Sequence, residues 1–207
     1  QIPERDGLTR LCGLSYALLR KRFRQATANE VTDSVERCLL TLGAADPEGH
    51  TLTMIYDLAP VMSARGMTLV VVAGAHNEQL QSLRRRDDLN TWMELHENVT
   101  DMASLMASCQ LAVSAAGSTL WELCVMGLPR VVFSIAPNQR PLAEAAADHG
   151  VARDLGPVRA VTPEVIRDHV NALIDDVQAR QEQAIRGRSL VDGQGALRVA
   201  QVLKEAL

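Results

Sequence analysis

Short apolar runs alternate with amphipathic segments along most of this sequence, and this alternation limits the possible folds more than any other feature. The apolar runs, each typical of a buried strand, cover residues 36–43, 67–74, 111–115 and 130–136, and a weaker strand pattern covers residues 92–99. The amphipathic segments, each typical of a helix, cover residues 50–66, 77–89, 102–109, a stretch around Glu122, and 141–149. Strands that are apolar along their whole length are buried on both faces. The sequence therefore predicts an α/β fold, a Rossmann-like parallel sheet with helices on both faces.

The two ends of the chain depart from this alternation. Residues 163–184 and 196–207 have helical patterns, with a break between them at the Asp-Gly-Gln-Gly of 192–195. Residues 1–30 are predicted to be a linker or edge segment, and residues 31–207 the Rossmann-like domain. Within the first segment, the basic "YALLRKRF" is either a connecting piece packed on the domain edge or a dedicated binding element. Because the sequence opens without a Met, we expect it to be a fragment of a longer protein.

Charge and composition exclude several classes of function. The formal net charge is −4, which argues against general nucleic-acid binding, because that needs a basic surface to displace counterions. No apolar stretch is long enough to span a bilayer, and no signal peptide is visible, so we expect a cytoplasmic protein without a transmembrane segment. The cysteines match no zinc-binding spacing, and buried thiols are the simpler interpretation for Cys12, Cys38, Cys109 and Cys124. We expect neither a metal nor a cofactor.

Ligands of an open parallel sheet bind at the carboxyl ends of the strands, where helix N-termini point outward. Three segments at that edge give weak signals. Gly43 ends the first strand, in a turn that either brings backbone amides toward an anion or only joins strand to helix. His76 follows the second strand and is either a ligand contact or a surface histidine. Asp101 or Thr100 precedes the helix at 102–109, and that loop either presents backbone groups to a base or provides a helix cap.

The stretch from Leu111 to Gln139 carries a stronger signal, because its smallest residues lie between a buried strand and a helix. Gly117 tolerates unusual dihedral angles and removes side-chain bulk, so phosphate oxygens can approach the backbone. Ser118 and Thr119 add hydroxyl donors at the start of the helix, whose positive end favours a diphosphate. Glu122 lies about one turn further on, where a carboxylate suits the two hydroxyl donors of a ribose diol.

Helix capping is the alternative interpretation of this stretch. Ser118 as an N-cap and Glu122 as its partner would form a capping arrangement that needs no ligand. Capping leaves Asn138 and Gln139 unexplained, although their amide side chains follow the next strand and can bind sugar hydroxyls or the distal phosphate. The combination therefore favours a nucleotide sugar as the ligand.

These residues resemble a known family. The segment "SAAGSTLWELCVMGLP", followed by "IAPNQ", is similar to the donor-binding region of GT-B enzymes of the MurG type. It is more similar still to the nucleotide-sugar hydrolases of pseudaminic acid biosynthesis, which also have counterparts of "LLTLGAADPEG", "ENVTDMASLM" and "YALLRKRF". The resemblance extends over nearly the whole chain, and its motifs occur in the same order.

The resemblance implies that this chain is the C-terminal half of a GT-B fold, that it binds a UDP-sugar, and that its partner is the missing N-terminal domain. It implies a hydrolase of the UDP-2,4-diacetamido-2,4,6-trideoxy-altropyranose type, acting without a metal in pseudaminic acid or related surface-polysaccharide biosynthesis. No catalytic residue is assigned, because the family's proposed catalytic histidine belongs to the other half. The residues implied to contact the nucleotide are Gly43, Val99, Met102, Ala116, Gly117, Ser118, Thr119 and Glu122, with Asn138 and Gln139 toward the sugar or phosphates.

Two departures and two alternative functions accompany this resemblance. Ala44 and Ala116 stand where the family usually has a second glycine, so each is expected to add a methyl group near the phosphates. The first alternative is the donor-binding domain of a MurG-like glycosyltransferase, which moves the sugar to an acceptor rather than to water. The second is a degenerate, non-catalytic nucleotide-binding domain.

Overall fold

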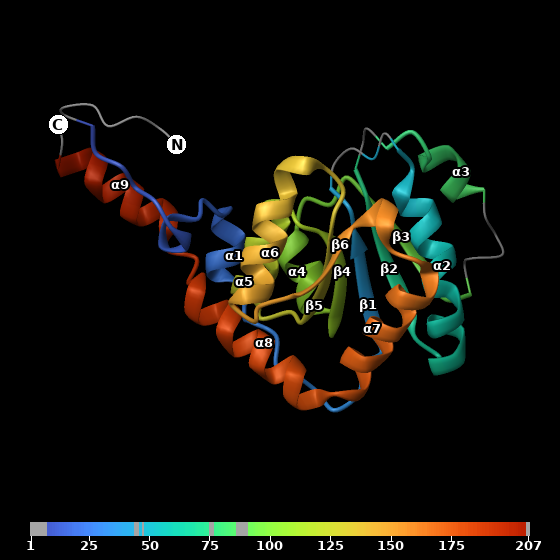
Figure 1. Cartoon of the computed structure of the whole chain (residues 1–207). Coiled ribbons are helices and arrows are strands. Elements are labelled where there is room, and N and C mark those ends of the chain that lie inside the picture. The colour runs from blue at the N-terminus through green and yellow to red at the C-terminus, as the bar shows by residue number, and fades with distance from the viewer. Residues whose placement is uncertain (1–7, 44–45, 47, 75–76, 86–90, 206–207) are drawn as a thin grey trace.

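A single parallel sheet organises the chain. The computed structural model describes residues 8–43, 46, 48–74, 77–85 and 91–205. Within these residues, six strands pair in parallel in the order β3-β2-β1-β4-β5-β6 (Figure 1). The strands are β1 (Arg37–Thr41), β2 (Thr68–Ala73), β3 (Met93–Glu97), β4 (Leu111–Ala115), β5 (Arg130–Ser134) and β6 (Arg153–Pro157). This is the doubly wound order, in which the winding reverses between β1 and β4, and the predicted fold class is confirmed.

Helices connect the strands and extend the chain at both ends. The α-helices are α1 (Lys21–Gln25), α2 (His50–Arg65), α3 (Leu80–Arg84), α4 (Met102–Ala107), α5 (Thr119–Met126), α6 (Arg140–Asp148), α7 (Pro163–Asp175), α8 (Val177–Leu190) and α9 (Gly195–Glu205). Short 3-10 helices occur at η1 (Leu14–Tyr16), η3 (Pro137–Gln139) and η4 (Val158–Ala160). The sequence pattern had therefore located the helices that follow β1, β2, β3, β4 and β5.

Two elements differ from the sequence expectation. The helix predicted over 163–184 is two helices, because the chain turns at Asp176, whose side chain accepts a hydrogen bond from the Ala179 amide and caps α8. Strand β6 was not predicted. It lies at the edge of the sheet and reads Arg-Asp-Leu-Gly-Pro, so it lacks the apolar run by which the central strands were recognised.

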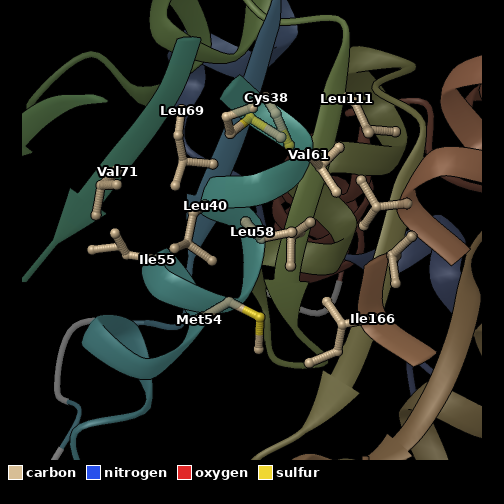
Figure 2. Close-up of a cluster of buried hydrophobic side chains, with 14 of the residues drawn as sticks. Cys38, Leu40, Met54, Ile55, Leu58, Val61, Leu69, Val71, Leu111 and Ile166 are labelled. Atoms are coloured by element: carbon tan, nitrogen blue, oxygen red, sulfur yellow. The ribbon is translucent and has the colours of Figure 1, made fainter. Parts of the chain in front are cut away.

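The pleat of the strands divides the core between the two faces of the sheet. Leu40 of β1 points to the face that α2 and α7 cover, where it lies near Leu58 and Ile166 (Figure 2). The neighbouring Leu39 points to the opposite face and packs with residues of α4 and α5, including Met106. Successive side chains of a strand alternate between faces, so a fully apolar strand requires helices on both sides.

The N-terminal segment and the C-terminal helix of the described chain pack against each other at one side of the domain. Helix α9 extends away from the sheet and packs along the N-terminal segment (Figure 1). Gly195 makes this contact possible, because a Cβ at that position would lie 2.3 Å from the carbonyl oxygen of Ala17. Arg198 donates to the carbonyl of Ser15 at 2.8 Å and also pairs with Asp192, which lowers the pKa of Asp192 to about 2.

Among the helices that the structure describes, none combines the length and the apolar character that a membrane span requires.

Core truncation provides a test of this packing. Leu40 is fully buried, so Leu40→Ala is expected to lower the free energy of unfolding by about 2–5 kcal/mol through lost burial and a residual cavity. Val165→Ala, on the exposed side of α7, should change it by less than about 0.5 kcal/mol. Urea denaturation of both variants measures the difference, and similar losses would contradict the assignment of Leu40 to the central core.

Candidate nucleotide-binding site

A cavity of about 380 Å³ opens at the point where the winding of the sheet reverses. The carboxyl ends of β1 and β2 form its floor, the turn before α4 forms one wall, and the first turn of α5 forms another. Ligands of doubly wound sheets bind in the crevice at this position, outside the carboxyl ends of the strands. The location therefore makes this cavity the candidate site.

The structure places half of the sequence-predicted site residues in this cavity. They come from the turn after β1, the loop before α4, and the start of α5: Gly43, Val99, Met102, Thr119 and Glu122. They meet because β1 pairs with both β2 and β4, which brings the ends of these strands to one edge. The structure also adds residues that sequence reasoning missed, among them Arg20, Thr41 and Asn98.

The other predicted residues lie outside the cavity lining. Gly117 and Ser118 occupy the turn between β4 and α5 and are partly exposed and exposed, respectively. Ala116 is fully buried below that turn. Asn138 and Gln139 belong to η3, beyond β5. Ala44, Ala45 and His76 lie outside the described residues.

Two positions beside the cavity have a left-handed backbone. Gly43 has φ of +103°, and nothing lies within 4 Å of the place where its Cβ would be. Asn98 has φ of +49°, a conformation that asparagine tolerates better than most side chains do. Both turns therefore have residue types that suit their conformation, and the glycine after β1 is required by the backbone itself.

Two reasons for Gly117 came from its sequence context, unusual dihedral angles and the absence of side-chain bulk, and the first of them is wrong. Its φ is not in the left-handed region, so the turn does not need glycine for its dihedral angles. A Cβ there would have one near neighbour, the Nε2 of Gln139 at 3.7 Å, which is an ordinary contact distance. The missing side chain instead leaves open space over the start of α5.

Helix capping accounts for Asp101 but not for Glu122. The Asp101 side chain accepts a hydrogen bond from the Ser104 amide at 3.2 Å and caps α4. At α5, the N-cap residue Ser118 makes no side-chain capping hydrogen bond. Glu122 is the fourth residue of that helix, whereas a capping box uses the third. The capping alternative for Ser118 and Glu122 is therefore not supported.

Glu122 is a mostly buried carboxylate with one cationic partner. Its side chain is 17% exposed, and Arg20 donates to its Oε1 at 3.0 Å. Burial raises the pKa of Glu122, and the Arg20 guanidinium acts against that rise. The Arg20 guanidinium in turn lies 5.2 Å from the centroid of the Phe23 ring. Arg20 belongs to the basic "YALLRKRF" piece, which sequence analysis had left open between a connecting segment and a binding element.

A second cavity, of about 600 Å³, opens next to η3 at the ends of β5 and β6. Its wall includes the apolar Ile135, Ala136 and Pro137, and Arg159 lies at its edge in an ion pair with Glu48 at 2.8 Å. η3 itself is fastened by Gln139, whose Oε1 accepts a hydrogen bond from the Ile135 amide at 3.0 Å. Gln139 thus lies between the turn at Gly117 and the second cavity.

Within the described residues, no group of three or more His, Cys, Asp or Glu side chains lies close enough to hold a metal ion. The chemistry offered by the first cavity is instead one buried carboxylate, one guanidinium, hydroxyl and amide side chains, and the N-terminus of α5. This set can bind a neutral group with paired hydroxyl donors and an adjacent anion.

Comparison with known proteins identifies the family. Residues 53–191 match the glycosyltransferase family 28 C-terminal domain. The chain belongs to this family. The spore coat polysaccharide biosynthesis protein SpsG of Bacillus subtilis is 28% identical over 202 residues, covering 97% of this chain and 60% of that protein.

Two further similarities agree with the family. A UDP-N-acetylglucosamine–N-acetylmuramyl-(pentapeptide) pyrophosphoryl-undecaprenol N-acetylglucosamine transferase of Sulfurimonas denitrificans is 33% identical, over 55% of this chain and 31% of that protein. The crystal structure of Acinetobacter baumannii MurG matches with a TM-score of 0.64 and 18% identity, covering 93% of this chain and 55% of that chain. At this identity the second similarity establishes the GT-B C-terminal fold alone. The chain spans a little over half the length of the SpsG and MurG chains it matches.

The expectation of a hydrolase is wrong. The family match and the structural neighbours indicate glycosyltransferases, so the transferase alternative has the better support. Similarity to a protein of the pseudaminic acid pathway extends over only 49% of this chain and does not establish that pathway.

The buried carboxylate predicts a dependence of stability on pH. Since burial raises the pKa of Glu122, the folded state binds its proton more tightly than the unfolded chain does. The resulting stabilisation is present below the unfolded pKa and is lost as the pH rises through the higher folded pKa. Glu122→Gln has no such titration, so its stability relative to wild type should be greater at about pH 7 than at about pH 4. Urea unfolding at both pH values measures this, and a constant difference would contradict it.

Proposed function

We propose that the first cavity binds the uridine of a UDP-sugar and that this chain is the donor-binding half of a glycosyltransferase. The observation that carries the proposal is the position of Glu122, a largely buried carboxylate in the first helical turn after β4, facing a cavity at the switch point of the sheet. Burying a carboxylate without a function is costly. A ribose diol would supply two donors to it and compensate that cost.

The diphosphate is proposed to lie over the turn of Gly117, Ser118 and Thr119. The first N–H groups of a helix have no intrahelical partner, and the positive end of the helix attracts an anion. No phosphate-binding lysine is then needed. Ala116 is fully buried, so its methyl group does not enter the proposed phosphate path, which removes one argument for a degenerate domain.

The glycosyl group is proposed to extend past Asn138 and Gln139 toward the second cavity. Neighbouring strands are about 4.8 Å apart, so a donor that begins between β1 and β4 reaches the end of β5 within the length of a nucleotide sugar. The Nε2 of Gln139 already lies beside the Gly117 turn. Its amide is therefore in a position to donate to the distal phosphate or to a sugar hydroxyl.

The proposal of a transferase for polysaccharide synthesis draws on the named relatives. SpsG is named for spore coat polysaccharide biosynthesis, and the Sulfurimonas protein for transfer of N-acetylglucosamine from UDP. Since the chain spans 60% of SpsG, we propose that the acceptor site and the catalytic base belong to an N-terminal domain, with residues 1–30 as the linker to it and residues 31–207 as the nucleotide-sugar-binding domain.

Replacement of Glu122 tests this proposal. Glu122→Ala should weaken UDP binding by at least about tenfold, because hydrogen bonds to a charged partner contribute about 1.5–3 kcal/mol. Glu122→Gln should also weaken it, since a neutral amide cannot accept two charge-assisted hydrogen bonds. Calorimetric titration with UDP measures both. Glu182→Gln, on the exposed surface of α8, is the matched control.

A UDP analogue without the two ribose hydroxyl groups tests whether Glu122 binds the ribose itself. Wild type should bind 2′,3′-dideoxy-UDP far more weakly than UDP, and the Glu122 variants should distinguish the two ligands little. If wild type binds both equally, or if Glu122→Gln binds UDP as well as wild type does, Glu122 is not the ribose ligand.

The open space at Gly117 gives a second test. Gly117→Ala should leave the thermal midpoint nearly unchanged, because the backbone is not left-handed and the nearest neighbour is at contact distance. The added methyl group should crowd the phosphate path at a cost of about 1–3 kcal/mol, and so weaken UDP binding about tenfold or more. Uridine, which has no phosphate, should bind as before. Equal weakening of uridine and UDP would place the phosphates elsewhere.

A further inference from the structure

The charged groups that line the first cavity are a single pair, Arg20 and Glu122, in the part of the chain that the structure describes. They lie 102 residues apart in the sequence and are joined by a contact of 3.0 Å between Nη2 of Arg20 and Oε1 of Glu122. The described residues provide no hydrogen bond to the other carboxylate oxygen, Oε2. Arg20 thus contacts one oxygen of a carboxylate that lines the cavity, and the second oxygen has no hydrogen bond from the described residues.

Arg20 is held in place although its side chain is 53% exposed. It directly precedes α1, and its guanidinium lies over the ring of Phe23, a residue only 2% exposed and packed in the core. The preceding residues are fixed against α9 by the close contact between Ala17 and Gly195. Arg20 is therefore anchored at both ends of its short segment, and its charge is presented to Glu122 from a fixed direction.

A cation in this position changes what Glu122 can do. Burial disfavours the charged form of a carboxylate, and a protonated carboxyl group is a weaker and less symmetrical acceptor for two hydroxyl donors. An opposite charge within about 4–6 Å favours the charged form. The strand ends and the α4 loop contribute uncharged cavity residues, including Thr41, Asn98 and Met102. At the start of α4, Asp101 is already paired with Arg22 at 2.9 Å.

We propose that Arg20 is a positioning residue for Glu122: it holds one carboxylate oxygen, keeps the group ionised, and so presents the second oxygen to the ribose diol. This inference rests on the proposed function, because it assigns the ribose as the ligand. It gives the basic "YALLRKRF" piece a role in the binding site. The contact between the N-terminal segment and α9 then helps to position Arg20, and through Arg20 it helps to position Glu122 in the donor site.

The test compares three variants of the chain. Arg20→Met removes the cation, Arg20→Lys keeps the charge, and Lys21→Met removes a neighbouring exposed charge as the control. The first readout is the titration of the Glu122 carboxyl group, followed by NMR without ligand. Arg20→Met should titrate at higher pH than wild type, Arg20→Lys should largely restore the wild-type value, and Lys21→Met should match wild type.

The second readout is calorimetric binding of uridine and of UDP at about pH 5.5 and about pH 8. Arg20→Met should weaken both ligands by a similar factor, larger at the lower pH and at most about tenfold there if the carboxyl titration moves by one unit, and smaller at the higher pH. The effect should disappear when Glu122→Gln is already present, because the two residues act as one unit.

The possible outcomes separate the roles. If Arg20→Met weakens UDP and leaves uridine unchanged, Arg20 is a phosphate contact and the proposal is overturned. An unchanged Glu122 titration in Arg20→Met overturns it as well. If wild type binds neither uridine nor UDP, the proposed function fails and the assigned ribose with it, whereas the titration without ligand still shows whether Arg20 controls the ionisation of Glu122.

Discussion

The pairing of β1 with β4 is the constraint on which the rest of the molecule depends. The register from Cys38–Leu111 to Thr41–Ser114 joins two strands that are separated by two complete strand–helix units in the sequence. Their carboxyl ends are thereby adjacent, while α2 and α5, which follow them, pack on opposite faces. The chain must diverge at this edge, so a crevice forms there without any dedicated element. The cavity that contains Glu122 is a consequence of this topology.

Arg180 and Glu122 are both charged and largely buried, but their hydrogen bonds differ in extent, and this difference separates a structural role from a binding role. Arg180 is almost fully buried and donates to the last carbonyl groups of α7, at Leu173 and Ile174, and to Thr32 and Asp33 beyond them. Those carbonyls lack helical partners, so this arginine fastens the corner between α7 and α8 to the start of β1. Among the described residues, Glu122 receives a hydrogen bond from Arg20 alone, at one of its two oxygens, which leaves capacity for a ligand.

The residues that bind a nucleotide sugar do not by themselves determine whether the sugar is transferred to an acceptor or to water. The donor-binding half of a GT-B fold provides the residues that hold the nucleotide, and the same set serves either chemistry. Sequence motifs from Ser114 to Gln139 therefore favoured a nucleotide sugar, but the resemblance drawn from them implied transfer to water, and that expectation was wrong. The family match over residues 53–191 gives the transferase the better support, because it compares the whole pattern of the domain with known relatives. Function belongs to the site rather than to the fold.

The sequence by itself determined the layered architecture and the approximate location of the site. Continuous apolar runs indicated four buried strands and a weaker pattern indicated β3, which lies half-exposed at an edge of the sheet. The small residues before Glu122 marked the helix start that faces the crevice. Only the tertiary structure decided the rest, for identifiable reasons. Strand β6 is polar and lies at the edge of the sheet, so hydrogen bonding to β5 defines it rather than hydrophobic periodicity. The dihedral angles of Gly117 depend on how β4 meets α5. Arg20 contacts a carboxylate that lies 102 residues away in the sequence. A local sequence pattern cannot predict such a contact, because only folding brings the two residues together.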